Sequence, residues 1–421
     1  MRSGTAPSGL RYAVRRSASS VGWCALSIRC GTRDEAGFRG GIAHFTEHTI
    51  FRGTKRKSAS VIGSYLDRLG GELNAYTTKE EIVLHATVLK EDLGKAARLL
   101  FELATEPTFP DDEIETERGV VLDEIISYKD NPVEDVYDKF EGMLFEGHPL
   151  GSPILGTTAS VRRITPEDLR RFVRTFFTPD RMAFTVVADV DEKVLERRVL
   201  RLAEKLFGGS DFSTRAGGEF SVISSEGEAG VEKSAWPRPF DKTVDKRNHE
   251  VNAVIGNRAP SLYEEEDRIT AAVLCNILGG PASNSLLNKE LREKNGWVYG
   301  VECSYTQYAD TGIAAISFGC DKPNLERCLQ TLDKILERLR EAPLSERFLK
   351  AAKRQLLGQI AISSASGEAQ CLSMGKSLLS WGRIDSSAET RARIEAVTPE
   401  ALQKMARRLF DPASLSRLIY L

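Results

Sequence analysis

The sequence has no uninterrupted apolar run near the length of about 20 residues that a helix needs to cross a bilayer. Basic residues occur within 1–16, but no apolar signal core accompanies them, so the sequence does not favour secretion. An organelle-targeting helix is not indicated either, because strand-like sequence begins almost at once. We therefore expect a cytoplasmic protein, with an organelle matrix as the alternative, and no membrane partner.

No cysteine pair has the Cys-x-x-Cys spacing, and the total of seven is odd, so neither a disulfide framework nor a thiolate metal site is indicated. A reducing compartment fits this cysteine usage. An excess of one charge is also missing, because 58 basic and 60 acidic side chains leave a net charge of -2. Without a global electrostatic field, we expect no nucleic-acid partner.

The chain does have length and an internal repeat. Its 421 residues are more than a domain with a single hydrophobic core usually contains. The segment TPEDLRRFVRTFFTP at 165–179 recurs as TPEALQKMARRLFDP at 398–412, an offset of 233 residues. Each copy begins with a threonine cap and a proline in the first helical turn, and a short β-like run follows at 183–187 and 416–420. We predict two homologous lobes from a tandem duplication.

The expected organisation is a first lobe at 1–210, a Gly-, Ser-, Pro- and charge-rich linker at 211–245, and a related lobe at 246–421. Helix and strand signals are mixed and do not alternate strictly. In the first lobe we expect a strand over 21–29, helices over 41–51 and 59–69, strands over 73–78 and 82–88, and a long helix over 111–128. This mixture favours an α+β class, with a mainly antiparallel sheet packed with helices in each lobe.

The segment His44-Phe-Thr-Glu47-His48 is the motif that indicates chemistry. On a helix, positions i and i+4 share one face with Cβ atoms about 6 Å apart, so both imidazoles can reach one ion. Glu47 then lies beside the pair, near a metal-bound water. This order is the inverted form of the His-Glu-x-x-His zinc motif. The alternative is an amphipathic helix whose histidines have ordinary partners.

A catalytic zinc needs three protein ligands and one open position for water. The helix expected over 111–128 offers Glu117 and Glu124, which are almost two turns apart on one face. One acid could bind the metal while the other supports a ligand histidine by a hydrogen bond. The spacing does not choose between them, and an acidic solvent face is the alternative interpretation.

Three stretches resemble the insulinase/pitrilysin family of inverted-motif zinc metallopeptidases, in particular its shorter, processing-peptidase-like type. They are GIAHFTEHTIFRGT at 41–54, GGELNAYT at 70–77 and ERGVVLDEI at 117–125, and the resemblance covers nearly the whole chain. It implies one Zn²⁺ per chain, held by His44, His48 and Glu124. It also implies that Glu47 activates the hydrolytic water and that Glu117 is the supporting acid.

The resemblance also implies substrate contacts. Asn74, Ala75 and Tyr76 are similar to the family's edge strand, to which an extended peptide adds as a further strand. In the second lobe, LREKNGWVYG resembles the family's Arg/Tyr signature, which implies that Arg292 and Tyr299 contact the substrate backbone or the developing oxyanion. The ordinary alternatives are a half-buried strand and solvated surface side chains.

The second lobe has no equivalent of the metal motif. Near the place where the repeat puts the histidine motif, the segment 271–278 has no histidine, and the segment 351–360, opposite the acidic helix, has no acid. We therefore expect metal chemistry in the first lobe and substrate contacts in the second.

These features predict a zinc metalloendopeptidase that acts on peptides or unfolded segments. The alternatives are a non-catalytic structural or peptide-binding subunit of a processing-peptidase-like complex, and a peptide binder with a structural metal. The presence of Glu47 disfavours the latter, because a structural zinc needs no general base. By the resemblance, one chain supplies half of a closed chamber, which implies a homodimer or a heterodimer with a paralogue.

Overall fold

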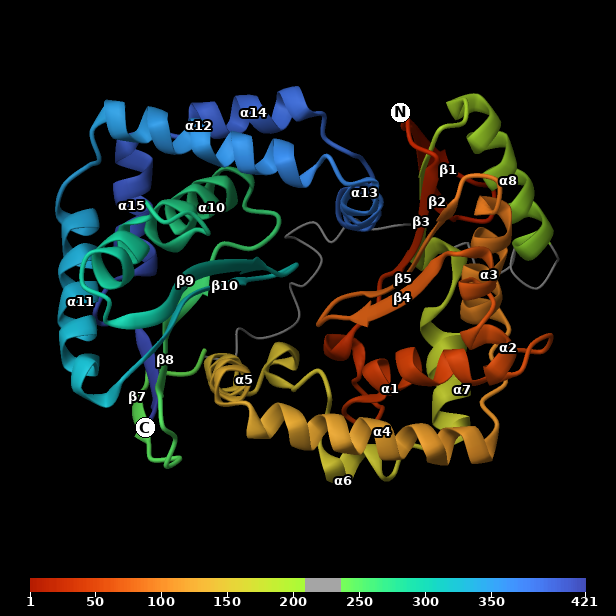
Figure 1. Cartoon of the computed structure of the whole chain (residues 1–421), viewed down its shortest axis with the longest axis horizontal. Helices are drawn as coiled ribbons and strands as arrows, with labels where there is room; N and C mark the ends of the chain where they lie inside the picture. The colour runs from red at the N-terminus through yellow and green to blue at the C-terminus, as the bar shows by residue number, and fades with distance from the viewer. Residues whose placement is uncertain (209–235) are drawn as a thin grey trace. The chain divides into compact units, whose positions relative to one another are not determined.

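The computed structural model describes residues 1–208 and 236–421. Within these ranges the chain forms two compact units, and each has one mainly antiparallel sheet packed with helices (Figure 1). Residues 1–126, 152–208 and 362–385 make the first unit, and 127–151, 236–361 and 386–421 make the second. The predicted α+β class with two related lobes is confirmed.

The first unit is built on a six-stranded sheet with the strand order β1-β2-β6-β3-β5-β4. Its strands are β1 (Arg2–Thr5), β2 (Arg11–Arg16), β3 (Val21–Ile28), β4 (Glu72–Thr77), β5 (Ile82–Leu89) and β6 (Met182–Ala188). All neighbours are antiparallel except β2 and β6. Strand β4 pairs with β5 and forms one edge of the sheet.

Helices cover both faces of this sheet. Successive strand residues point to opposite faces, so Leu26 and Leu84 pack with helix α3 (Leu93–Thr105), whereas Ala25 and Val83 pack with Met374 of helix α13 (Gly367–Trp381). The helices of this unit are α1 (Ile42–Thr49), α2 (Ala59–Gly63), α3 (Leu93–Thr105), α4 (Asp111–Asp130, which ends in the second unit), α6 (Thr158–Val161), α7 (Pro166–Phe176), α8 (Glu192–Phe207) and α13 (Gly367–Trp381).

The second unit has a five-stranded sheet with the order β7-β11-β8-β10-β9, in which all neighbours are antiparallel except β7 and β11. Its strands are β7 (Asp241–Val244), β8 (Val251–Ala259), β9 (Val298–Gln307), β10 (Gly312–Cys320) and β11 (Ser416–Tyr420). Its helices are α5 (Pro132–Leu144), α10 (Glu265–Gly279), α11 (Leu325–Glu341), α12 (Glu346–Ser363), α14 (Ser387–Ala396) and α15 (Pro399–Leu409). None of the described helices in either unit combines the length and apolarity needed to span a bilayer.

The repeated threonine-capped motif folds in the same way in both units. Thr165 accepts a hydrogen bond from the backbone N–H of Asp168 at the start of α7, and Thr398 accepts one from Ala401 at the start of α15. Each helix is followed by a strand, β6 or β11, in the interior of its sheet. Both predicted caps and both predicted strands are therefore confirmed.

The two repeats exchange one helix. Helix α5 comes from the first repeat but packs on β8 and β11 of the second unit, through side chains such as Phe140. Helix α13 comes from the second repeat but packs on β3 and β6 of the first unit, through side chains such as Met374. Adding the repeat offset of 233 to the bounds of α5 gives 365–377, which falls on α13. The exchanged helices are thus equivalent parts of the repeat.

The expected lobe boundaries, 1–210 and 246–421, follow the repeat along the chain, whereas the compact units also include the exchanged segments 127–151 and 362–385. Residues 211–235 of the expected linker lie outside the described residues. Strand β7 occupies the end of the linker range, where it pairs with β11 at the edge of the second sheet.

The helix expected over 59–69 is interrupted. Helix α2 ends at Gly63, and a 3-10 helix at Asp67–Leu69 follows after a turn. Gly63 and Ser64 are both poorer helix formers than alanine or leucine, which explains the break. The helix expected over 41–51 is α1 followed by a 3-10 turn at Ile50–Arg52, and Gly53 with φ 152° ends it.

Candidate metal centre

Helix α1 presents the histidine motif, and a buried acid caps its N-terminus. Gly41, the N-cap residue, has φ 86° and offers no side chain. The carboxylate of Glu35 instead accepts hydrogen bonds from the backbone N–H groups of Gly41 at 2.8 Å and Ala43 at 2.9 Å. A Cβ at Gly41 would lie 2.7 Å from the carbonyl oxygen of Leu155, so glycine is required there. Burial raises the pKa of Glu35 to about 7.

Three side chains converge beside α1. His44, His48 and Glu124 each offer a ligand atom, and these atoms lie within 4.8 Å of one another. Glu124 Oε2 lies 3.7 Å from Nε2 of His44 and 3.4 Å from Nε2 of His48. Among the described residues, no other group of three or more His, Cys, Asp and Glu side chains is arranged in this way. Helix α4 therefore brings Glu124 to the imidazole pair that the i, i+4 spacing predicted.

The chemistry of this group fits a divalent cation such as zinc. Glu124 Oε2 is buried and has no hydrogen-bond partner in the described part of the chain, a state that costs free energy unless a positive charge compensates it. Burial, together with the nearby His48, lowers the pKa of His44 to about 3, so His44 is neutral at pH 7. A neutral imidazole and a carboxylate are the protonation states that bind zinc.

Glu117 lies behind His48. Its Oε1 is 2.8 Å from His48 Nδ1, and its Oε2 forms an ion pair with Arg52. Burial favours the protonated acid, but the hydrogen bond with His48 and the charge of Arg52 outweigh it and lower the pKa of Glu117. An ionised Glu117 accepts a hydrogen bond from the Nδ1–H of His48, which leaves the lone pair of Nε2 directed at the site.

Glu47 lies on the same helix, beside His48. Its Oε2 accepts a hydrogen bond of 3.0 Å from the hydroxyl of Thr77, the last residue of β4. Burial raises the pKa of Glu47, while the charge of His48 and the hydrogen bond from Thr77 act in the opposite direction. The predicted general base therefore occupies a partly desolvated position next to the candidate ligands.

Asn74, Ala75 and Tyr76 lie in β4, at the edge of the first sheet. They pair with His85, Leu84 and Val83 of β5, respectively. The other side of β4 has no neighbouring strand in the described part of the chain. The edge position that the resemblance implied is therefore present, and contact with a substrate stays a prediction.

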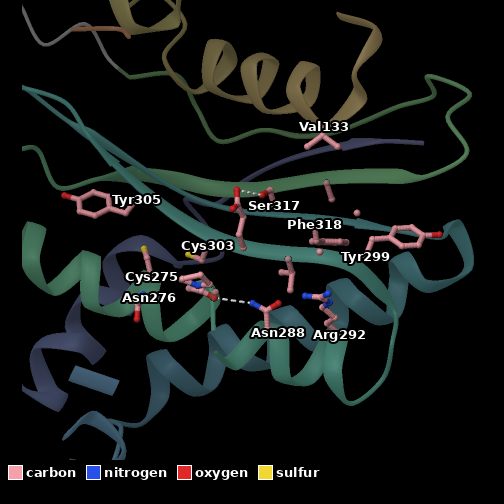
Figure 2. Close-up of a pocket in the computed structure, with 18 of the residues that line it drawn as sticks. Val133, Cys275, Asn276, Asn288, Arg292, Tyr299, Cys303, Tyr305, Ser317 and Phe318 are labelled. Carbon is pink, nitrogen blue, oxygen red and sulfur yellow. Dashed lines mark hydrogen bonds between the residues drawn. The ribbon is translucent and has the colours of Figure 1, made fainter. Parts of the chain in front are cut away.

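Arg292 and Tyr299 lie in the second unit. They line a hollow of about 760 Å³, Arg292 from a π-helix at Asn288–Glu293 and Tyr299 from β9 (Figure 2). The Tyr299 side chain is largely exposed, and its hydroxyl donates a hydrogen bond of 2.8 Å to Asp321. Their role toward a substrate also stays a prediction.

The second unit joins the counterparts of α1 and α4 with a neutral pair. The repeat maps α1 onto α10 and α4 onto α12, where Asn276 Nδ2 donates to Gln359 Oε1 at 2.9 Å. In the first unit α1 and α4 are linked instead by the contact of His48 with Glu117. The two amides satisfy each other in this link, which therefore needs no cation.

Three residues of the site were not predicted from the sequence. Arg52 and Thr77 lie inside the stretches that carry the family resemblance, at 41–54 and 70–77, and this was the only available signal for them. Glu35 precedes the motif helix by several residues, and a glutamate at that distance is more often an exposed surface residue than a buried helix cap. These contacts depend on how separate elements pack.

Comparisons with known proteins identify the family of this chain. Residues 12–158 match the family described as insulinase (peptidase family M16), and residues 163–356 match the peptidase M16 inactive domain. The chain belongs to the M16 insulinase family. The inactive-domain match in this M16 chain fits a second unit without a histidine motif.

Relatives of this M16 chain include proteins named as zinc proteases. An uncharacterized zinc protease of Streptomyces coelicolor is 30% identical, covering 97% of this chain and 86% of its own length. The uncharacterized zinc protease YmxG of Bacillus subtilis is 30% identical, covering 91% of this chain and 89% of its own length.

Two solved structures share the M16 fold. A protease from Helicobacter pylori has a TM-score of 0.84 at 20% identity, covering 100% of this chain and 99% of its own. A protein from Pseudomonas fluorescens, described as a peptidase M16 inactive domain, has a TM-score of 0.86 at 19% identity, covering 100% and 97%.

Proposed function

We propose that this chain is a zinc metalloendopeptidase that hydrolyses peptide bonds in peptides or unfolded segments. One observation carries the proposal: two imidazoles and a carboxylate converge, and a second acid, Glu47, lies beside them. A structural metal site has no use for that second acid. The zinc proteases among the relatives support the same activity.

His44, His48 and Glu124 would hold the ion. Zinc, when bound, supplies a Lewis acid that lowers the pKa of a water molecule and polarises the carbonyl of the substrate. Glu117 holds His48 through Nδ1, so that Nε2 faces the other two ligands. The low pKa of His44 keeps its ring free of a competing proton at neutral pH.

Glu47 would act as the general base. It takes a proton from the attacking water and then passes it to the nitrogen of the leaving amine. Partial burial suits this role, because it raises the pKa of the carboxyl and strengthens the conjugate base. The reaction consumes one water per peptide bond and returns the same proton to the product.

Strand β4 would hold the substrate. An extended peptide can pair with the edge of the sheet at Asn74, Ala75 and Tyr76, where backbone hydrogen bonds give binding that tolerates varied side chains. We also propose that Arg292 and Tyr299 contact the substrate backbone or the oxyanion. Assembly as a homodimer, or as a heterodimer with a paralogue, belongs to the same proposal.

A peptidase assay with a matched variant tests the proposal. We expect the purified protein to cleave an internally quenched peptide, and to lose this activity with a zinc chelator. Glu47→Gln should still bind zinc but cleave at less than about 1% of the wild-type rate, because general-base catalysis contributes about 10² to 10⁴-fold. Glu91→Gln, a change of the same kind at an exposed acid remote in sequence, is the control. Cleavage by Glu47→Gln at the wild-type rate would refute the mechanism.

A further inference from the structure

The hydroxyl of Thr77 links the edge strand to Glu47. Thr77 ends β4 and donates to Glu47 Oε2 at 3.0 Å, while Glu47 lies near the end of α1. No other side-chain hydrogen bond to Glu47 occurs among the described residues. The carboxylate is therefore held by one donor, which belongs to a different element from the helix that carries it.

The donor is held more firmly than the acceptor. Thr77 pairs with Ile82, a fully buried residue of β5, so the backbone of Thr77 is anchored in the sheet. Threonine is also β-branched, which restricts the torsion that points its hydroxyl. A glutamate side chain has three rotatable bonds and loses considerable rotamer freedom when it is ordered. The sheet can thus fix a carboxylate that the helix alone would leave mobile.

We propose that Thr77 is a positioning residue, which orients the Glu47 carboxylate for proton transfer and aligns it with the strand that receives the peptide. This inference rests on the proposed function. If a peptide pairs with β4, its backbone takes its position from the same strand that holds the base. Through Thr77, both the register of the substrate and the position of the Glu47 carboxylate then depend on β4. This matters because a misplacement of about 1 Å between a catalytic group and its substrate lowers the rate markedly.

Two substitutions separate the hydroxyl from the side-chain volume. Thr77→Val keeps the shape and removes the donor, whereas Thr77→Ser keeps the donor. Thr87→Val is the matched control, because Thr87 lies on β5 opposite Glu72, at the far end of the β4–β5 pairing. Five residues of strand separate the two positions, a distance of about 17 Å.

We expect Thr77→Val to lower kcat about tenfold or more, with KM and zinc content within about twofold of wild type. Thr77→Ser should restore kcat to within about threefold, and Thr87→Val should leave both constants unchanged. A wild-type kcat in Thr77→Val would overturn the inference. So would an equal loss in Thr77→Ser, or a rise in KM alone, because either result would indicate a role in strand packing or substrate binding.

A second measurement does not depend on activity. Crystal structures of the metal-free wild type and of Thr77→Val should show the Glu47 carboxylate ordered in the first and displaced or spread over several rotamers in the second. An unchanged, ordered carboxylate in Thr77→Val overturns the inference. If the wild type shows no chelator-sensitive cleavage, the proposed function fails, and this comparison alone decides whether Thr77 positions Glu47.

Discussion

His48 Nδ1 lies 2.8 Å from Glu117 Oε1, so His48 turns its other ring nitrogen toward Glu124, at 3.4 Å. This relationship gives the two acids of α4 different surroundings, although they are separated by only seven residues on one helix. Glu117 is enclosed and paired with Arg52, whereas Glu124 is more open and shares the space between two imidazoles. The different surroundings of Glu117 and Glu124 lead to the first two predictions, and the Glu35 cap on α1 leads to the third.

The first prediction concerns zinc content. Glu124→Gln should abolish stoichiometric zinc binding, because a neutral amide is a much poorer ligand than a carboxylate. Asp123→Asn, the same change at the exposed neighbouring acid, should retain one zinc per chain. Elemental analysis after dialysis measures both. Full zinc content in Glu124→Gln would show that Glu124 is not a ligand.

The second prediction concerns zinc affinity. Glu117→Gln should weaken zinc binding by about 10- to 100-fold without abolishing it, because the partner of a ligand histidine tunes the basicity and orientation of that histidine. Competition with a chelator of known affinity measures the change. Glu115→Gln, at an exposed acid on the same helix, serves as the control. Equal affinity in wild type and Glu117→Gln would contradict a supporting role.

The third prediction concerns the pH dependence of stability. Burial raises the pKa of Glu35 to about 7, from the ordinary 4.5, so the folded protein binds this proton more tightly than the unfolded chain. The stabilisation is complete below pH 4.5 and is lost as the pH rises through about 7. The total effect is on the order of 3 kcal/mol.

Denaturant titrations of the metal-free protein between pH 4.5 and 8 test this dependence. The free energy of unfolding should fall with rising pH in the wild type, and the fall should be smaller in Glu35→Gln, which cannot ionise. Glu91→Gln should keep the wild-type slope. Identical slopes in Glu35→Gln and wild type would show that Glu35 does not titrate in this range.

The fourth prediction concerns the exchanged helix α13. A Cβ at Gly367 would lie 2.2 Å from the ring of Trp23, so Gly367→Ala should destabilise the first unit by about 1–3 kcal/mol through overpacking. Gly358→Ala lies in α12 with nothing within 4 Å of the added carbon, and it should stabilise by up to about 1 kcal/mol. Denaturation followed by tryptophan fluorescence measures both. An unaffected Gly367→Ala protein would show that α13 can shift away from β3.

Local features of the fold were predictable because their causes are local. A threonine, a proline and two acids in four residues start α7 wherever the helix packs, and Thr398 acts in the same way for α15. The break in the helix expected over 59–69 was missed. Gly63 is only a weak helix breaker, and the helical apolar pattern continues past it to Leu69. The exchange of α5 and α13 was also missed, since an amphipathic helix shows that it packs but not on which sheet.

The sequence by itself determined that His44 and His48 share one face with Glu47 beside them, because 3.6 residues per turn fix that arrangement within a single helix. Helical spacing alone did not separate Glu124 from Glu117, because the two share a face of α4, and only the family resemblance assigned their roles. In the tertiary structure the packing of α4 against α1 decides which of them meets the imidazoles. The same holds for Thr77, whose hydroxyl reaches Glu47 across 30 residues of chain because β4 and α1 pack together. Helical periodicity is a property of neighbouring residues, whereas contacts between elements exist only once the core has formed.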